Sequence, residues 1–137
     1  AVRMYQQRNP GAHPGSSVER VGHVFGRPRF EGPTRYERTM AAVEQVFGPT
    51  GACYALFEEL FEAETVTRIC RFLGIGAHDP DFDRRVNTSP KERGHRMPEP
   101  LARRVAEHYR STYDAVADRF GRDAVLRRWP TARLLDW

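Results

Sequence analysis

The stretch ACYALF, residues 52–57, lies between Gly51 and the acids Glu58 and Glu59 and carries no charged side chain. A short apolar run bounded by a glycine and by charged residues is typical of a buried β-strand. Helical patterns occur on both sides of it, and a fully apolar strand between helices is typical of a parallel sheet. The sequence therefore predicts an α/β fold in which residues 52–57 form one strand and helices flank the sheet.

Two amphipathic helices are predicted on either side of this run. The first begins at Thr34, with Glu37 at the spacing of a capping box, and continues to residue 47. The second covers residues 64–73, where Val66, Ile69, Cys70 and Leu73 recur at helical spacing. Cys70 on that apolar face is expected to be a small buried core residue.

The carboxy-terminal third of the chain predicts the longest helix, residues 100–120, followed by a short helical turn over 124–129. Its expected buried stripe is Leu101, Val105, Tyr109, Tyr113, Val116 and Phe120. Residues 9–33 and 75–97 are rich in proline, glycine and polar residues and are predicted to be loops. Residues 1–8 have the pattern of the last turns of a helix, which leads us to expect that polypeptide precedes Ala1.

Length and charge narrow the classes of function. A chain of 137 residues suits one domain, and its net charge of +4 suits an anionic ligand, a nucleic acid or a merely basic surface. No apolar stretch is long enough to span a membrane, and no signal peptide is visible, so we expect a cytoplasmic protein without a membrane partner. The spacing of Cys53, Cys70 and the five histidines fits no common metal site, and no metal is expected.

The segment VNTSPKERGHRMP, residues 86–98, is the most informative polar stretch. It holds Ser89, Arg93, Gly94 and Lys91, the only lysine among 22 basic residues. Hydroxyls, cations and a glycine that lets backbone N–H groups approach are what a phosphate site requires. The alternative is an ordinary solvated loop, and local composition alone leaves both interpretations open.

Other polar residues carry weaker signals. His108 lies near the apolar edge of the long helix, where a hydrogen-bonded structural role is expected. Glu58 and Glu59 are expected to cap a helix or bind loop backbone, since no paired base is visible nearby. A basic face made by arginines of two helices suggests a nucleic-acid-binding module as a rival, although acids alternate with these arginines as on a solvated helix face. The arginines are Arg68, Arg71, Arg103, Arg104 and Arg110.

Four segments together resemble the PAPS-dependent sulfotransferases, which use 3′-phosphoadenosine 5′-phosphosulfate. FEELF followed by CRFLGI resembles the family's "y-E-D-L … i-c-x-F-L-G-l" stretch, and residues 86–98 are similar to its late cofactor loop. AEHYRSTYDAVADRFG resembles the family's carboxy-terminal helix, and AVRMY resembles its "R-A-x-S-x-Y" helix, with Arg3 at the serine position. The resemblance covers nearly the whole chain and is weakest in residues 9–33.

The resemblance implies that residues 1–137 are the carboxy-terminal part of a single sulfotransferase domain, a fragment of a P-loop-like parallel-sheet fold. Such a protein transfers a sulfuryl group from PAPS to a hydroxyl or amine of a small-molecule or carbohydrate acceptor. The implied cofactor-binding residues are Arg3, Ser89, Lys91, Arg93 and Gly94. The family's phosphosulfate loop and catalytic base have no counterpart here, so a missing amino-terminal half is the implied partner and this chain alone is expected to be inactive. The alternatives are a non-catalytic scaffold and the nucleic-acid-binding module, of which nucleic-acid binding is the less expected.

Overall fold

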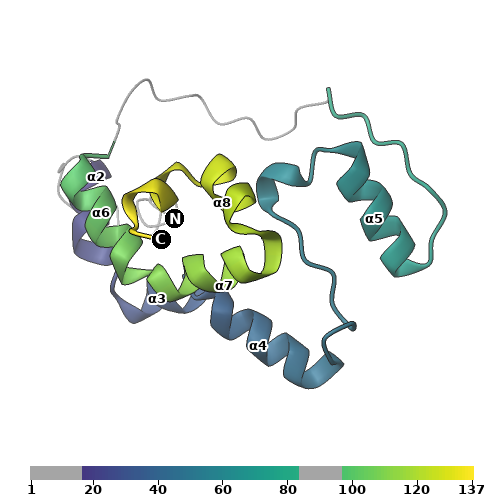
Figure 1. Cartoon of the computed structure of the whole chain (residues 1–137), viewed down its shortest axis with the longest axis horizontal. Helices are drawn as coiled ribbons and strands as arrows, with labels where there is room; N and C mark the ends of the chain where they lie inside the picture. The colour runs from purple at the N-terminus through teal and green to yellow at the C-terminus, as the bar shows by residue number, and fades with distance from the viewer. Residues whose placement is uncertain (1–16, 84–96) are drawn as a thin grey trace, which may run out of the picture. The chain divides into compact units, whose positions relative to one another are not determined.

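A computed structural model describes residues 17–83 and 97–137 of the chain (Figure 1). Within these two ranges every regular element is a helix. The α-helices are α2 Ser17–Val24, α3 Pro28–Thr34, α4 Tyr36–Phe47, α5 Ala63–Leu73, α6 Glu99–His108, α7 Arg110–Phe120 and α8 Arg122–Arg128. Two short 3₁₀-helices are η1 Phe57–Glu59 and η2 Pro130–Leu134. No helix in the described ranges is both long enough and apolar enough to cross a membrane.

The predicted strand at residues 52–57 is wrong, and with it the α/β class and the parallel sheet. The described part of the chain contains no strand and is all-α. Leu56 does have an extended backbone, with φ −71° and ψ 138°, and its side chain is buried. A strand, however, exists only through ladder hydrogen bonds to a neighbour, and no described segment pairs with these residues. The apolar run instead leads directly into the turn of η1.

The chain forms two compact units, which are described separately. Unit 1 consists of Ala1–Met40 and Glu92–Trp137, and unit 2 consists of Ala41–Lys91. In unit 1, α7 and η2 pack on α8, and α6 packs on η2 and α7. The described apolar core of unit 1 is made by Ala102, Ala106, Tyr109, Val116, Val125, Ala132 and Leu135. In unit 2 the buried described residues are Leu56, Thr65 and Cys70.

The predicted helix over residues 100–120 is in fact two helices that meet at Tyr109. The backbone of Tyr109 has φ −102° and ψ 20°, so it leaves the helical region between α6 and α7. Its N–H still bonds to the Val105 carbonyl at 3.1 Å, and its own carbonyl accepts from the N–H of Thr112 at 2.9 Å. Tyr109 therefore ends one helix and begins the next.

The buried face of α6 and α7 also differs from the predicted stripe of large residues. Its buried members include the small residues Ala102, Ala106 and Thr112, whereas Leu101 and Val105 are only partly buried. Small side chains allow α8 and η2 to approach closely. The hydrophobic periodicity of large residues alone could not reveal this, because alanine carries a weak signal.

The predicted loop over residues 9–33 is wrong in its described part, because α2 and α3 occupy most of residues 17–33. Pro28 begins α3, a position where its fixed φ favours a helix and its missing N–H costs nothing. The predicted capping box is also wrong, because Thr34 ends α3. Its hydroxyl donates to the carbonyls of Phe30 and Glu31, at 2.9 and 3.0 Å.

Three predicted helices are confirmed with small shifts of their ends, as α4, α5 and α8. At the end of α5, Gly74 adopts φ 66° and donates to the Arg71 carbonyl, while Ile75 donates to the Cys70 carbonyl. This pair of bonds needs a left-handed residue, which glycine supplies without steric cost. Cys70 is buried, as predicted. The helix predicted over residues 1–8 lies outside the described residues.

Candidate functional site

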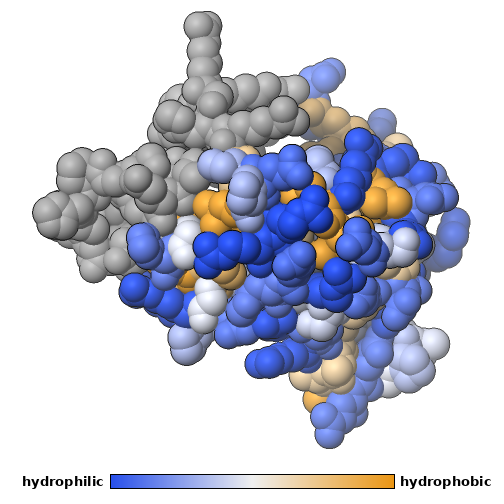
Figure 2. All heavy atoms as spheres, turned by 60° about the vertical axis from the view of Figure 1, so that its left-hand side comes forward, coloured by the Kyte–Doolittle hydropathy of each residue, from blue (hydrophilic) through white to orange (hydrophobic). Residues whose placement is uncertain are grey.

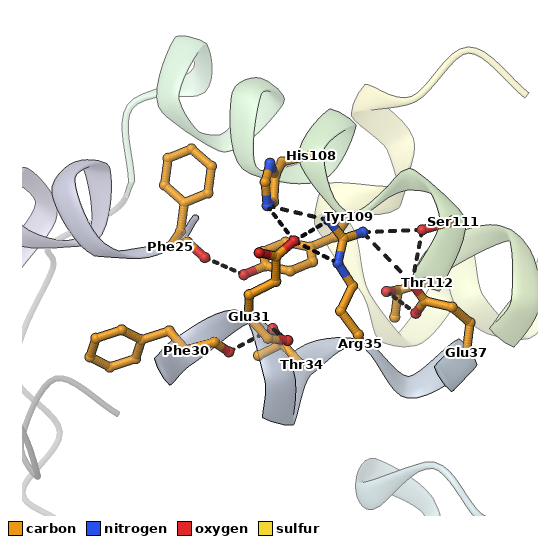
Figure 3. Close-up of polar contacts among 10 residues, drawn as sticks. All are labelled: Phe25, Phe30, Glu31, Thr34, Arg35, Glu37, His108, Tyr109, Ser111 and Thr112. Carbon is orange, nitrogen blue, oxygen red and sulfur yellow. Dashed lines mark hydrogen bonds and ion pairs between the residues drawn. The ribbon is translucent and has the colours of Figure 1, made fainter. Parts of the chain in front are cut away.

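The five residues predicted to bind the cofactor, Arg3, Ser89, Lys91, Arg93 and Gly94, lie outside the described residues. Their positions and contacts are therefore not part of the site below. Within the described ranges, no group of three or more His, Cys, Asp or Glu residues could hold a metal ion. The most connected polar feature of the described structure is instead a cluster within unit 1 (Figure 3).

This Arg35 cluster joins the α3–α4 junction to the α6–α7 junction. Its members are Glu31, Arg35, Glu37, His108, Tyr109, Ser111 and Thr112 (Figure 3). Arg35 is the residue between α3 and α4, and its side chain is only 12% exposed. Figure 2 shows hydrophilic residues over much of the described surface, and most charged side chains stand in water, so a largely buried guanidinium is a distinct feature of unit 1.

The guanidinium of Arg35 makes polar contacts on several sides. Its Nε and Nη2 both donate to Glu31 Oε1, at 3.0 and 2.5 Å. Its Nη1 donates to Ser111 Oγ at 3.1 Å and lies 3.7 Å from Glu37 Oε1. Two carboxylates thus compensate one partly buried cation, which offsets the cost of removing its charge from water.

Tyr109 forms the floor of the cluster. Its hydroxyl donates to the Phe25 carbonyl, and the guanidinium carbon of Arg35 lies 5.1 Å from its ring centroid. The His108 ring packs edge-on against two aromatic rings. The distance between ring centroids is 4.8 Å from His108 to Tyr109 and 5.2 Å from His108 to Phe25. The break between α6 and α7 therefore places one aromatic ring against the α2–α3 turn and against Arg35.

His108 has the hydrogen-bonded position that the sequence suggests for it. Its Nε2 lies 3.4 Å from Glu31 Oε1 and 3.4 Å from Arg35 Nη2. A neutral ring can accept from the arginine, and a protonated ring can donate to the glutamate. A histidine beside a carboxylate also has the composition of an acid–base pair, but here Arg35 already occupies the same carboxylate oxygen. The geometry is that of a structural contact that links the end of α6 to α3.

Glu37 holds the other side of the cluster. Its two oxygens accept from Ser111 at 2.9 Å and from Thr112 at 2.5 Å. Burial raises the pKa of this carboxyl, but the hydrogen bonds from Thr112 and Ser111 and the charge of Arg35 outweigh burial, so that the pKa lies below its ordinary value. The hydrogen bond from Arg35 likewise holds the pKa of Glu31 below the ordinary value.

These two shifts predict an acid-sensitive unit 1. A carboxyl whose pKa is lowered by folding stabilises the folded state above its ordinary pKa, near 4.5, and loses that contribution as the pH falls through the folded pKa. We expect the free energy of unfolding to be nearly constant around neutral pH and to fall below about pH 4.5. Urea unfolding followed by tryptophan fluorescence measures it, since Trp129 and Trp137 both lie in unit 1.

The control for this pH dependence is the pair of variants Glu31→Gln and Glu37→Gln. Each removes one titrating carboxyl and should flatten the acid limb of the stability curve. An acid limb that is identical in the parent chain and in both variants would assign the pH dependence to other carboxyls.

Three arginines proposed for a basic face make internal contacts. Arg103 donates to the Leu134 carbonyl at 2.9 Å, and Arg110 donates to the Asp136 carbonyl at 3.2 Å, both within unit 1. In unit 2, Arg68 donates to the Tyr54 carbonyl at 2.8 Å. These guanidinium groups fasten loops and chain ends to helices, which is a structural use of positive charge.

The Arg35 cluster is not among the sites predicted from the sequence, although the sequence carries one signal for it. Glu31 and Arg35 stand four residues apart, the spacing at which opposite charges pair along a helix. Their partners on α6 and α7 could not be read locally, because they lie more than seventy residues further along the chain.

No family model, no curated protein and no solved structure matches this chain.

Proposed function

We propose that this chain is the carboxy-terminal part of a PAPS-dependent sulfotransferase. The observation that carries the proposal is the order of four sequence motifs, AVRMY, FEELF with CRFLGI, VNTSPKERGHRMP and AEHYRSTYDAVADRFG. CRFLGI includes the end of α5, and the last motif covers the last turn of α6 and the whole of α7. The parallel sheet that the resemblance implies is absent from the described part of the chain, so the proposal rests on the motifs alone.

In this proposal Lys91, Arg93 and the N–H of Gly94 contact the 3′-phosphate of the cofactor, with Ser89 beside them and Arg3 approaching from the first motif. A compact ammonium and a planar guanidinium complement phosphate oxygens, and such charge-assisted hydrogen bonds are about twice as strong as neutral ones. The amino-terminal half of the domain supplies the phosphosulfate loop and the catalytic base. The acceptor is a hydroxyl or amine of a small molecule or carbohydrate.

The test is cofactor binding by the natural protein that carries this chain. The desulfonated cofactor, 3′-phosphoadenosine 5′-phosphate, is titrated by calorimetry into the parent protein and into Lys91→Ala. We expect Kd to rise about ten- to a hundred-fold in the variant, the effect of losing one charge-assisted contact. Arg127→Ala, an exposed position on α8, is the matched control and should leave Kd unchanged.

Two results would contradict the proposal. One is a parent protein that does not bind the cofactor at all, and the other is equal affinity in the parent and in Lys91→Ala. If binding is found, sulfuryl transfer to hydroxyl and amine acceptors separates an active enzyme from a scaffold that has kept only its cofactor loop.

A further inference from the structure

The two units differ in how they expose large apolar side chains. Among the described residues, the large hydrophobic side chains that stand out into solvent lie in unit 2, with Tyr36 of unit 1 as the exception. Those of unit 2 are Val46, Phe47, Phe57, Leu60, Phe61, Phe72, Leu73 and Ile75. Exposed apolar groups gathered in one part of a chain indicate an interaction surface more often than scattered ones do.

The densest group lies on the segment FEELFEAE, residues 57–64. Phe57 and Phe61 are 69% and 60% exposed, and Leu60 between them is 37% exposed. The two phenyl rings meet edge-to-face with their centroids 5.8 Å apart, so they form one continuous aromatic ridge. We call residues 57–64 the Phe57–Phe61 surface.

The backbone that carries this surface is held in place. Leu56, immediately before it, is only 4% exposed, and Arg68 of α5 donates to the Tyr54 carbonyl at 2.8 Å. Within the surface, Leu60 N–H bonds to the Phe57 carbonyl at 3.2 Å. The two rings are therefore presented by an ordered turn, which lowers the entropy that a binding partner would have to remove.

The charge around the ridge is negative. Glutamates occur at positions 58, 59, 62 and 64, and the nearest basic residue in the sequence, Arg68, donates to the Tyr54 carbonyl. The chain as a whole carries a net charge of +4, so this segment is opposite in sign to the rest of the molecule. Basic groups on a partner that covers the ridge would face carboxylates of opposite charge, which favours association.

We propose that the Phe57–Phe61 surface binds a basic amphipathic helix of another protein. Such a helix offers an apolar ridge at i, i+3 and i+4 that can pack on the two rings, with Lys or Arg on either side facing the glutamates. A nucleic acid or an anionic membrane is disfavoured as the occupant, because both carry the same sign of charge as this surface. The inference is independent of the proposed sulfotransferase function.

The test uses the full chain and a fluorescent peptide of about 18 residues, which is about five helical turns. Leucines lie on one face of this helix and lysines on the other, and we call it the Leu–Lys helix. Fluorescence anisotropy gives its Kd. Two comparison peptides replace every lysine by glutamate or scramble the order of the leucines. We expect binding of the Leu–Lys helix that weakens with salt, and at least tenfold weaker binding of both comparison peptides.

Variants locate the site on the chain. Phe61→Ser and the double variant Glu58→Gln, Glu64→Gln should each raise the Kd of the Leu–Lys helix about tenfold or more. Val46→Ser is the apolar control, because Val46 is 73% exposed outside the surface. The charge control is Glu107→Gln with Asp114→Asn, exposed acids of unit 1. Both controls should change Kd less than twofold, with helical ellipticity confirming that each variant is folded.

Three outcomes would overturn the proposal. The first is equal affinity for the Leu–Lys and Leu–Glu peptides, and the second is an unchanged Kd in both Phe61→Ser and the glutamine double variant. The third is a concentration-dependent dimer that Phe61→Ser abolishes and the peptide does not displace, which would assign the surface to a second copy of the chain.

Discussion

Replacing Tyr109 by alanine should lower the free energy of unfolding of unit 1 by about 3–4 kcal/mol, the usual loss when a buried aromatic ring is truncated. Tyr109 is 9% exposed, and its ring lies between Arg35 and His108. The substitution leaves a cavity at the α6–α7 junction and also removes the hydroxyl that donates to the Phe25 carbonyl. Urea unfolding followed by tryptophan fluorescence measures the change.

The matched variant Tyr109→Phe separates the ring from the hydroxyl. It keeps the packing and removes only the hydrogen bond to Phe25, for which a loss of about 1 kcal/mol is expected. Equal destabilisation by alanine and phenylalanine would show that the Tyr109 ring contributes little packing to the α6–α7 junction.

Replacing Arg35 by alanine should destabilise unit 1 by more than loss of a surface ion pair does, because it leaves the carboxylates of Glu31 and Glu37 without their cation. The arginine also covers the Tyr109 ring, so packing is lost together with charge. Arg35→Lys should recover only part of the loss, since an ammonium cannot reproduce the several hydrogen bonds of the guanidinium fork. The measurement is the same urea titration at neutral pH.

The control for Arg35 is an ion pair of the same spacing on the surface. Glu99 and Arg103 are four residues apart on α6, at 3.3 Å, with side chains 69% and 44% exposed. Glu99→Ala should change the stability by less than about 1 kcal/mol. Equal effects of Glu99→Ala and Arg35→Ala would show that the Arg35 cluster is no more than an ordinary surface pair.

Helices with a local apolar period could be predicted from the sequence, and the tertiary features could not. α5 illustrates the first case, because its apolar positions recur within one short segment and Gly74 marks its end. The run ACYALF illustrates the second, because composition reports burial, whereas a strand also requires a neighbour to pair with. The segment is extended at Leu56 and has no partner strand in the described ranges.

Neither the break at Tyr109 nor the Arg35 cluster could be predicted from the sequence, for a related reason. No glycine or proline marks the break, and the contacts that accompany it come from Phe25 and Arg35, far away in sequence. A helix pattern read in a window of residues continues through such a point. The candidate site could be predicted only in part, through the local Glu31–Arg35 spacing, and the cofactor loop stays a prediction.

The separation of the Arg35 cluster along the chain has a consequence for how unit 1 folds. Its hydrogen bonds join residues 75, 76 and 84 positions apart, more than half of the 137-residue length. The entropy of closing so long a loop must be overcome before any of these bonds forms. Helical proteins fold fastest when their contacts are local. Unit 1 is helical in its elements but its Arg35 cluster is non-local, so we expect chain closure, and not helix formation alone, to limit the rate at which the cluster forms.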